Sequence, residues 1–126
     1  MEQKYLIDTN TAIDYLDNKL PDKANSLIDS IESFISVITR MELLAWPGAT
    51  LQQTAILEDF TYSSLVYPLE EPVILKAIEI RRTYKTKLPD AIIAATAMVY
   101  NLRLISRNTK DFKNITGLSV IDPYSL

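Results

Sequence analysis

Four acidic residues lie where expected strands or loops give way to expected helices: Asp8, Glu42, Asp90 and Asp111. The chain contains no His and no Cys, so hydrolysis by this chain has neither an imidazole base nor a thiolate nucleophile to use. The oxygen ligands that are left suit a hard cation such as Mg²⁺ or Mn²⁺. The four carboxylates are therefore the candidate metal ligands and the candidate catalytic groups.

Asp8 and Glu42 each have a structural explanation as well. Asp8 follows the apolar residues 5–7, at a position where Asp is a favoured N-cap for the helix that begins next. Glu42 lies three residues after Thr39, which is the spacing of a capping box, in which both side chains bind free backbone N–H groups. Both explanations stay open beside the interpretation as metal ligands.

Asp90 and Asp111 also lie at expected helix starts. Asp90 follows Pro89 in a first helical turn, where a negative charge interacts favourably with the helix dipole. Asp111 lies three residues after Asn108, which is another cap-like spacing. These explanations share a geometry with the catalytic hypothesis, because each places a carboxylate at the start of a helix.

Short apolar segments alternate with amphipathic segments along the chain, which is typical of strands alternating with helices. The expected strands are 4–7, 34–38, 65–67, 103–106 and 119–121. The expected helices are 10–16, 22–31, 40–46, 51–62, 72–84, 89–100 and 109–113. This alternation predicts an α/β fold, a three-layer α/β/α sandwich around a mainly parallel sheet. In such folds, sites form at the carboxyl ends of the strands, near the helix N-termini.

Convergence of the four carboxylates at one edge of the sheet has an energetic cost. Two carboxylates about 5 Å apart repel each other by roughly 3 kcal/mol at an effective dielectric constant near 20. Either a cation or the uptake of protons must relieve that repulsion. A divalent metal relieves it and lowers the pKa of a bound water, which can then attack a phosphodiester. The set therefore predicts metal-dependent phosphodiester hydrolysis.

Polar and basic residues near the four acids are candidates for supporting roles. Asn10 either caps the first helix or orients Asp8 or a metal-bound water, while Ser106 ends the fourth expected strand and Asn108 follows it. Residues 71–126 hold nine Lys or Arg against five Asp or Glu. Such charge beside an acidic site fits a phosphate backbone, although a solvated helix face explains it equally. The candidate substrate-binding residues are Arg81, Arg82, Lys85, Lys87, Arg107 and Lys110.

Composition sets further limits. With 126 residues, of which 48% are hydrophobic, the chain fits one globular domain over residues 1–126. It shows neither a signal-peptide pattern nor an apolar stretch near the ~20 residues that cross a bilayer, so we expect a cytoplasmic protein without membrane attachment. Its net charge of −3 argues against a generally basic nucleic-acid-binding surface. We expect the other acids on amphipathic helices to be solvated, namely Asp14, Asp17, Asp22, Asp29, Glu32, Glu58, Asp59 and Glu79.

Three segments resemble motifs of PIN-domain ribonucleases, specifically of VapC-like toxins from type II toxin–antitoxin systems. YLIDTNTAIDYL resembles the opening motif, ISVITRMELL the second, and KLPDAIIAATAMVYNLRLISRNTKDF the most specific one. The resemblance runs nearly from end to end of the chain. It departs from the family pattern at Ser106, where Thr is usual, but the hydroxyl is kept.

The resemblance implies a site and a set of partners. It makes the four acids the ligands of Mg²⁺ or Mn²⁺, with Asn10 and Asn108 at supporting positions. It implies a PIN-like sandwich with endoribonuclease activity on RNA, commonly as a homodimer. It also implies a small antitoxin that covers the site, with operon DNA bound only through that antitoxin.

Two other functions stay open as alternatives. A PIN-fold binding module would act by association without turnover, but the retention of all four acids gives it little support. A phosphotransfer or phosphatase domain would use Asp8 as its nucleophile. Haloacid-dehalogenase-like enzymes need a second Asp where this chain has Asn10, and receiver domains need an adjacent acidic pair that Asp8 lacks.

Overall fold

The computed structural model describes residues 2–126, and its core is a parallel β-sheet. The strands are β1 (Tyr5–Ile7), β2 (Phe34–Ser36), β3 (Leu65–Tyr67), β4 (Arg103–Ile105) and β5 (Val120–Ile121). They lie in the order β3-β2-β1-β4-β5, and each neighbouring pair is parallel. The sheet that was expected to be mainly parallel is therefore parallel throughout, with β1 at its centre.

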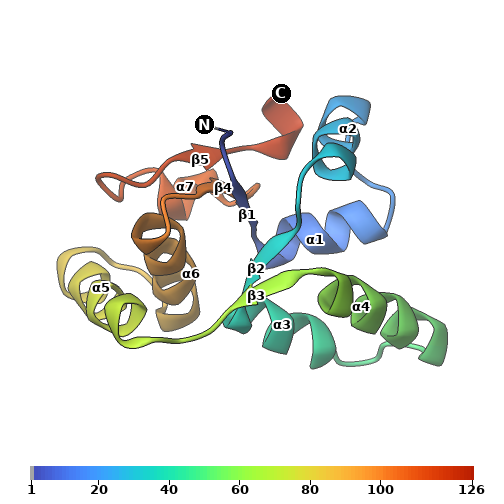
Figure 1. Cartoon of the computed structure of the whole chain (residues 1–126), viewed down its shortest axis with the longest axis horizontal. Helices are drawn as coiled ribbons and strands as arrows, with labels where there is room; N and C mark the ends of the chain where they lie inside the picture. The colour runs from blue at the N-terminus through green and yellow to red at the C-terminus, as the bar shows by residue number, and fades with distance from the viewer. Residues whose placement is uncertain (1) are drawn as a thin grey trace.

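Helices cover both faces of this sheet, which confirms the predicted α/β sandwich (Figure 1). The helices are α1 (Thr9–Leu16), α2 (Asp22–Ser30), α3 (Val37–Leu44), α4 (Leu51–Ser63), α5 (Glu71–Thr83), α6 (Leu88–Val99) and α7 (Thr109–Phe112), followed by a 3₁₀ turn at Pro123–Ser125. Among residues 2–126, no helix is long and apolar enough to span a membrane.

Alternate residues of the central strands supply two separate hydrophobic cores, because successive side chains of a strand point to opposite faces. Leu6 packs on the side of α5, α6 and α7, together with Phe34 and Leu104. Its neighbour Ile7 packs on the side of α1 and α2. Figure 1 shows the sheet between these two groups of helices. Burial on both faces explains why such short strands are almost entirely apolar.

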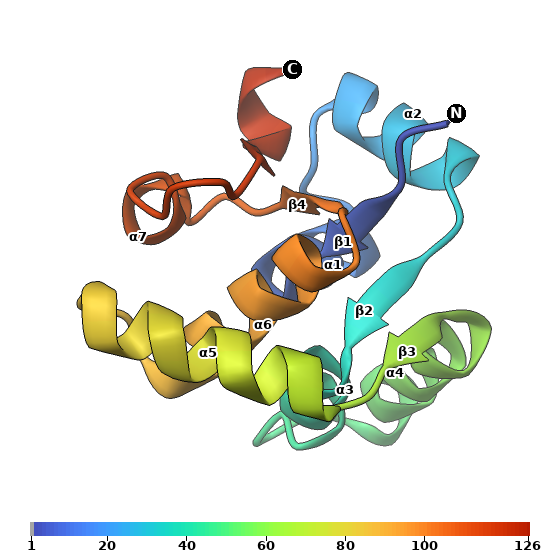
Figure 2. The same cartoon turned by 60° about the vertical axis from the view of Figure 1, so that its left-hand side comes forward.

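The helix α6 is the most deeply buried helix of the molecule. Pro89 lies in its first turn, and every residue from 91 to 97 is buried. Four of these seven residues are alanines, whose small side chains let the helix approach both the sheet and α5. Figure 2 shows α5 running beside α6 on one face of the sheet. This packing fixes the position of the first turn of α6, which carries Asp90.

The prediction for the second strand and its following helix is wrong in one respect. The strand ends at Ser36, and α3 begins at Val37 rather than near residue 40. Ser36 is the N-cap, since its Oγ accepts a hydrogen bond from the Ile38 N–H at 3.1 Å. The β-branched Val37 and Ile38 resemble strand residues, but the cap determines their conformation. The other elements agree with the expected ranges to within one residue.

Candidate active site

Asp8 lies at the carboxyl end of the central strand and is the N-cap of α1, as predicted. Its carboxylate accepts hydrogen bonds from the Thr9 N–H at 2.9 Å and from the Ser106 hydroxyl at 2.7 Å. The side-chain amide of Asn10 donates to the same carboxylate at 3.2 Å. Only 4% of Asp8 is exposed. Asn10 thus lies inside α1 and orients Asp8, which was one of its two expected roles.

The surroundings of Asp8 raise its pKa from 3.8 to about 6. Burial is the largest cause, because it disfavours the charged form. The hydrogen bonds from Ser106 and Thr9 oppose this shift, and the nearby charges of Asp90 and Glu42 add to it. The carboxyl of Asp8 is therefore held in a place where its negative charge is costly and where a cation would relieve that cost.

Glu42 lies in the second turn of α3 and is exposed to solvent. Its Oε1 accepts a hydrogen bond of 2.7 Å from the Thr9 hydroxyl, which also lies 3.0 Å from the hydroxyl of the buried Thr39. The expected capping box of Thr39 and Glu42 is wrong, because α3 begins earlier and Ser36 is its cap. Glu42 is instead hydrogen-bonded to Thr9, the first residue of α1, which follows Asp8.

Asp90 lies in the first turn of α6, as predicted, and is half-buried. Burial is the largest cause of a raised pKa at this carboxyl. The charges of Asp111 and Glu42 raise that pKa further, whereas the charge of Lys87 lowers it. Asp90 therefore interacts electrostatically with two other members of the predicted acidic set.

Asp111 lies on the short helix α7 and is exposed. Asn108 holds its carboxylate through a side-chain amide that donates at 3.0 Å. The expected cap at this spacing is not formed by the Asn108 side chain, although Asn108 occupies the N-cap position. The Asn108 backbone N–H donates to the Ser106 hydroxyl at 3.0 Å. Ser106 thus connects the surroundings of Asp111 to Asp8, to which its hydroxyl donates.

The structure brings the four acids into one electrostatic neighbourhood. Asp8 interacts with Asp90 and Glu42, and Asp90 interacts with Asp111 and Glu42. Within the described residues 2–126, no three acidic side chains are arranged so as to hold a metal ion in their present positions. The donor set nevertheless fits Mg²⁺ or Mn²⁺, because it consists of carboxylate oxygens whose mutual repulsion a hard divalent cation offsets.

The candidate substrate-binding residues differ in their surroundings. Arg82, Lys85, Lys87 and Lys110 are exposed. Arg81 donates through Nη1 to the backbone oxygen of Thr86 at 2.5 Å and so braces the loop before α6. Arg107 donates through Nη1 to Asp14 at 2.8 Å. The structure thus divides the predicted basic set into free side chains and side chains with internal partners.

Two residues of this network were missed or misplaced by the sequence interpretation. The expectation that Asp14 is solvated is wrong, because it is only 3% exposed and is bound by Arg107 and Tyr124. Its spacing of four residues from Asn10, which puts both on one face of α1, was a usable signal. Thr9 gave no such signal, because its partner Glu42 is 33 residues away. The other seven acids expected to be solvated are exposed.

Comparison with protein families and known proteins agrees with this geometry. The model of the PIN domain family matches residues 5–118. A curated relative, "Ribonuclease VapC" of Rickettsia bellii, is 30% identical and aligns over 92% of this chain and 93% of its own length. The family match includes the strands and helices that carry the four acids.

Solved structures with the same fold belong to toxin–antitoxin complexes. A toxin–antitoxin complex from Klebsiella pneumoniae has a chain 32% identical to this one, with a TM-score of 0.79 over 98% of this chain and all of that one. A DNA-bound VapBC of Salmonella typhimurium has a chain 26% identical, with a TM-score of 0.83, covering 97% of this chain and 99% of that one.

Proposed function

This chain belongs to the PIN-domain family and is related to the VapC toxins of VapBC toxin–antitoxin systems, and we propose that it is a metal-dependent endoribonuclease acting as such a toxin. The observation that carries the proposal is the electrostatic coupling of four carboxylates, one directly after β1 and the others on α3, α6 and α7, at one edge of a parallel sheet. The name of the curated relative, a ribonuclease, supports it.

The proposed site would hold Mg²⁺ or Mn²⁺ through the carboxylates of Asp8, Glu42, Asp90 and Asp111. When bound, such a cation lowers the pKa of a coordinated water and offsets the charge that develops on the phosphate. The protein contributes a fixed frame. Ser106 and the Thr9 backbone N–H hold both oxygens of Asp8, and the Thr9 hydroxyl holds one oxygen of Glu42.

We assign the RNA-binding role to the basic residues of α5, α7 and the loop before α6: Arg81, Arg82, Lys85, Lys87 and Lys110. Four of them precede Asp90 in the chain, Lys110 is adjacent to Asp111, and the charge of Lys87 acts on Asp90. Because the whole chain carries a net charge of −3, RNA binding is expected to depend on this local surface. We further propose that residues 1–126 act as one PIN-like domain in the cytoplasm. We also propose that the chain forms a homodimer, and sedimentation velocity of the purified chain tests this oligomeric state.

A cleavage assay with matched variants tests the activity. The purified chain is expected to degrade structured RNA with Mg²⁺ or Mn²⁺, and EDTA or Asp90→Asn is expected to abolish this. Asp59→Asn, which changes an exposed acid on α4, is the control and should leave cleavage unchanged. Undiminished cleavage by the Asp90→Asn protein would reveal a contaminating nuclease and remove the main claim.

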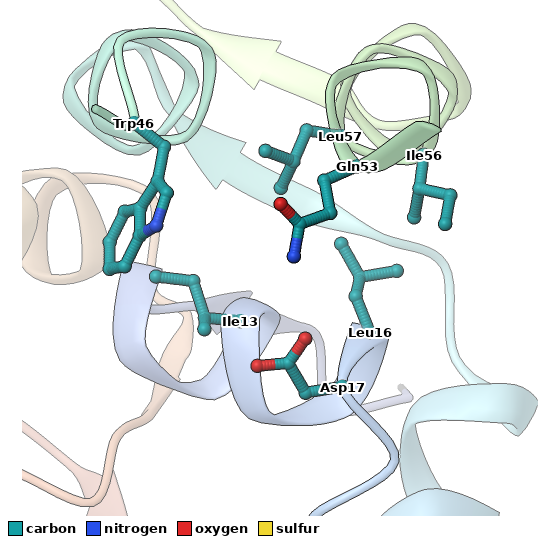
Figure 3. Close-up of a pocket in the computed structure, with 7 residues that line it drawn as sticks. All are labelled: Ile13, Leu16, Asp17, Trp46, Gln53, Ile56 and Leu57. Carbon is teal, nitrogen blue, oxygen red and sulfur yellow. The ribbon is translucent and has the colours of Figure 1, made fainter. Parts of the chain in front are cut away.

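An apolar groove offers a surface for the proposed antitoxin (Figure 3). It lies between α1 and α4, has a volume of about 100 Å³, and is lined by Ile13, Leu16, Asp17, Trp46, Gln53, Ile56 and Leu57. The C-terminal half of α1 lines this groove, and the N-terminus of the same helix follows Asp8. The proposed occupant is therefore an amphipathic antitoxin segment with a basic residue opposite Asp17.

The antitoxin assignment is tested by expressing the chain with the small open reading frame next to its gene. Ile56→Asp should weaken the complex, because it places a charge in an apolar contact, while RNA cleavage by the free variant should stay at the wild-type rate. Leu75→Asp, on the exposed surface of α5, is the control. Equal weakening by both variants would remove the groove from the proposal.

A further inference from the structure

A buried carboxylate on α1 joins three distant parts of the chain. Asp14 is 3% exposed, and its Oδ2 accepts a hydrogen bond from Arg107 Nη1 at 2.8 Å and from the Tyr124 hydroxyl at 2.7 Å. These partners are 93 and 110 residues away along the chain. Burying a carboxylate is costly unless it is paired, so the fold depends on both partners at this point. The proposed hydrolysis does not use Asp14 directly.

The pair of Asp14 and Arg107 leads to the acidic site through one main-chain group. The backbone N–H of Arg107 donates to Asn10 Oδ1 at 3.3 Å, and the Thr11 hydroxyl lies 3.1 Å from the same oxygen and 3.0 Å from the backbone oxygen of Ile105. With its oxygen held in this way, the NH₂ group of Asn10 must point to the opposite side. On that side it donates to Asp8 Oδ2 at 3.2 Å.

The same amide of Asn10 also lies 3.3 Å from the Ser106 hydroxyl, which donates to Asp8. The position of the Arg107 backbone therefore determines how Asn10 is turned, and Asn10 in turn supports the carboxylate of Asp8. The ion pair with Asp14 and the hydroxyl of Tyr124 fix that backbone position. Each step in this series is a hydrogen bond between named atoms, except the covalent side chain that joins the guanidinium of Arg107 to its backbone.

We propose that Arg107 is a positioning residue, anchored by Asp14 and Tyr124, which orients Asn10 and through it Asp8, and is not a contact to the RNA phosphates. The sequence expectation was the opposite, because Arg107 is basic and adjacent to the site. In the structure its guanidinium is directed to Asp14, and it is the backbone N–H of Arg107 that faces the site. This inference rests on the proposed function for its catalytic meaning, but its geometry is independent of it.

Three variants test the proposal, namely Arg107→Lys, Tyr124→Phe and Asp14→Asn. Lys110→Gln is the control for a phosphate contact. Arg107→Lys keeps the charge but loses the planar fork, and Tyr124→Phe removes only a hydroxyl. We expect Arg107→Lys to lower kcat about 10-fold, and to weaken Mn²⁺ binding by RNA-free protein about 10-fold in calorimetry, with KM and its salt dependence unchanged. Tyr124→Phe should cause about a threefold change in the same direction. Lys110→Gln should raise KM and weaken its salt dependence, because it removes a proposed phosphate contact, without the loss of Mn²⁺ affinity.

Hydrogen exchange provides a measurement that needs neither RNA nor metal. In both Arg107→Lys and Tyr124→Phe, the backbone amide of Arg107 should exchange faster than in the wild type, while Lys110→Gln should leave it unchanged. Because Tyr124→Phe alters a half-exposed residue, it keeps the test available if Asp14→Asn, the third variant, does not fold. Failure of the wild type to cleave RNA would remove the proposed function, but exchange would still test the network.

Two results would overturn the positioning role. One is that Arg107→Lys keeps the wild-type kcat and Mn²⁺ affinity but has a raised KM with a weaker salt dependence. That result would identify Arg107 as a phosphate contact. The other is unchanged exchange of the Arg107 amide in Tyr124→Phe, which shows that the hydroxyl anchors nothing.

Discussion

The acidic edge of the sheet has two unequal parts. The strand part consists of Asp8, Asn10 and Ser106, which follow the central neighbours β1 and β4 and hold one another by hydrogen bonds. The helix part consists of Glu42, Asp90 and Asp111, of which Glu42 and Asp111 are exposed and each bound by a single side chain. The strand part is thus built before any ligand arrives, whereas the helix part has room to adjust around one.

The largest expected effect separates the two parts by mutating one acid of each. Asp8→Asn should lower the RNA cleavage rate on the order of 10³-fold, the scale of losing a preorganised electrostatic group. Asp111→Asn should lower it only about 10-fold, because a flexible exposed ligand is more easily replaced by water. Single-turnover rates at saturating Mn²⁺ measure both losses. Equal losses in the two variants would show that the strand part and the helix part do not differ in their contribution to cleavage.

The second effect concerns stability without metal. The folded pKa of Asp8 is about 6 against 3.8 for an unperturbed Asp, so the folded state binds the proton more tightly between these values. Stability contributed by this group therefore falls as pH rises from 3.8 to 6 and stays low above 6. The difference is on the order of 3 kcal/mol. Asp8→Asn should be more stable than the wild type at pH near 7.5, in metal-free urea unfolding.

The control for this stability effect is Asp59→Asn, whose pH dependence should match that of the wild type. Millimolar Mn²⁺ should raise the melting temperature of the wild type at neutral pH and should have less effect on Asp8→Asn. Parallel pH dependences for wild type and Asp8→Asn would mean that the buried carboxyl does not carry the cost assigned to it.

The third effect tests the connection between the two parts. Thr9 binds Asp8 through its backbone N–H and Glu42 through its hydroxyl. Thr9→Val keeps the shape and removes the hydroxyl, so kcat should fall about 10-fold, the scale of losing an outer-shell partner. Thr9→Ser restores a hydroxyl and should recover most of that rate. A Thr9→Ser variant as slow as Thr9→Val would point to packing rather than to the hydrogen bond.

The smallest effect is a pKa change that removing one positive charge, that of Lys87, should cause in the helix part but not in the strand part. Lys87 lowers the pKa of Asp90 and is not among the groups that act on Asp8. Lys87→Gln should therefore raise the pKa of Asp90 further and leave that of Asp8 unchanged, as followed by NMR titration of the side-chain carboxyls without metal. A shift of both carboxyls by the same amount would show that the two parts titrate as one.

The fold was largely predictable because local patterns determine most of its elements. Apolar runs of three or four residues identified the strands, and Pro89 identified the start of α6. The exception was the start of α3, where Val37 and Ile38 favour a strand by their side chains and a helix by the Ser36 cap. A choice between two local preferences is settled by the surrounding structure, which the sequence does not show.

The site was predictable as a set of residues but not as a network. Motif resemblance and helix-start positions selected the four acids, and the structure couples them. Glu42 lies 33 residues from Thr9, and the partners of Asp14 lie 93 and 110 residues from it, so no local pattern could reveal them. For the same reason the sequence placed Arg107 among the candidate substrate-binding residues, whereas in the structure its guanidinium binds Asp14.

The central strand β1 is synthesised first but pairs with β4, which is synthesised late. Asp8 depends on Ser106, which follows it by 98 residues. At a synthesis rate of about 5–20 residues per second, roughly 5 to 20 s pass between the addition of these two residues. A growing chain therefore carries its first acid for most of its synthesis without the neighbour that holds it. The proposed metal site is therefore complete only after nearly the whole chain has been synthesised.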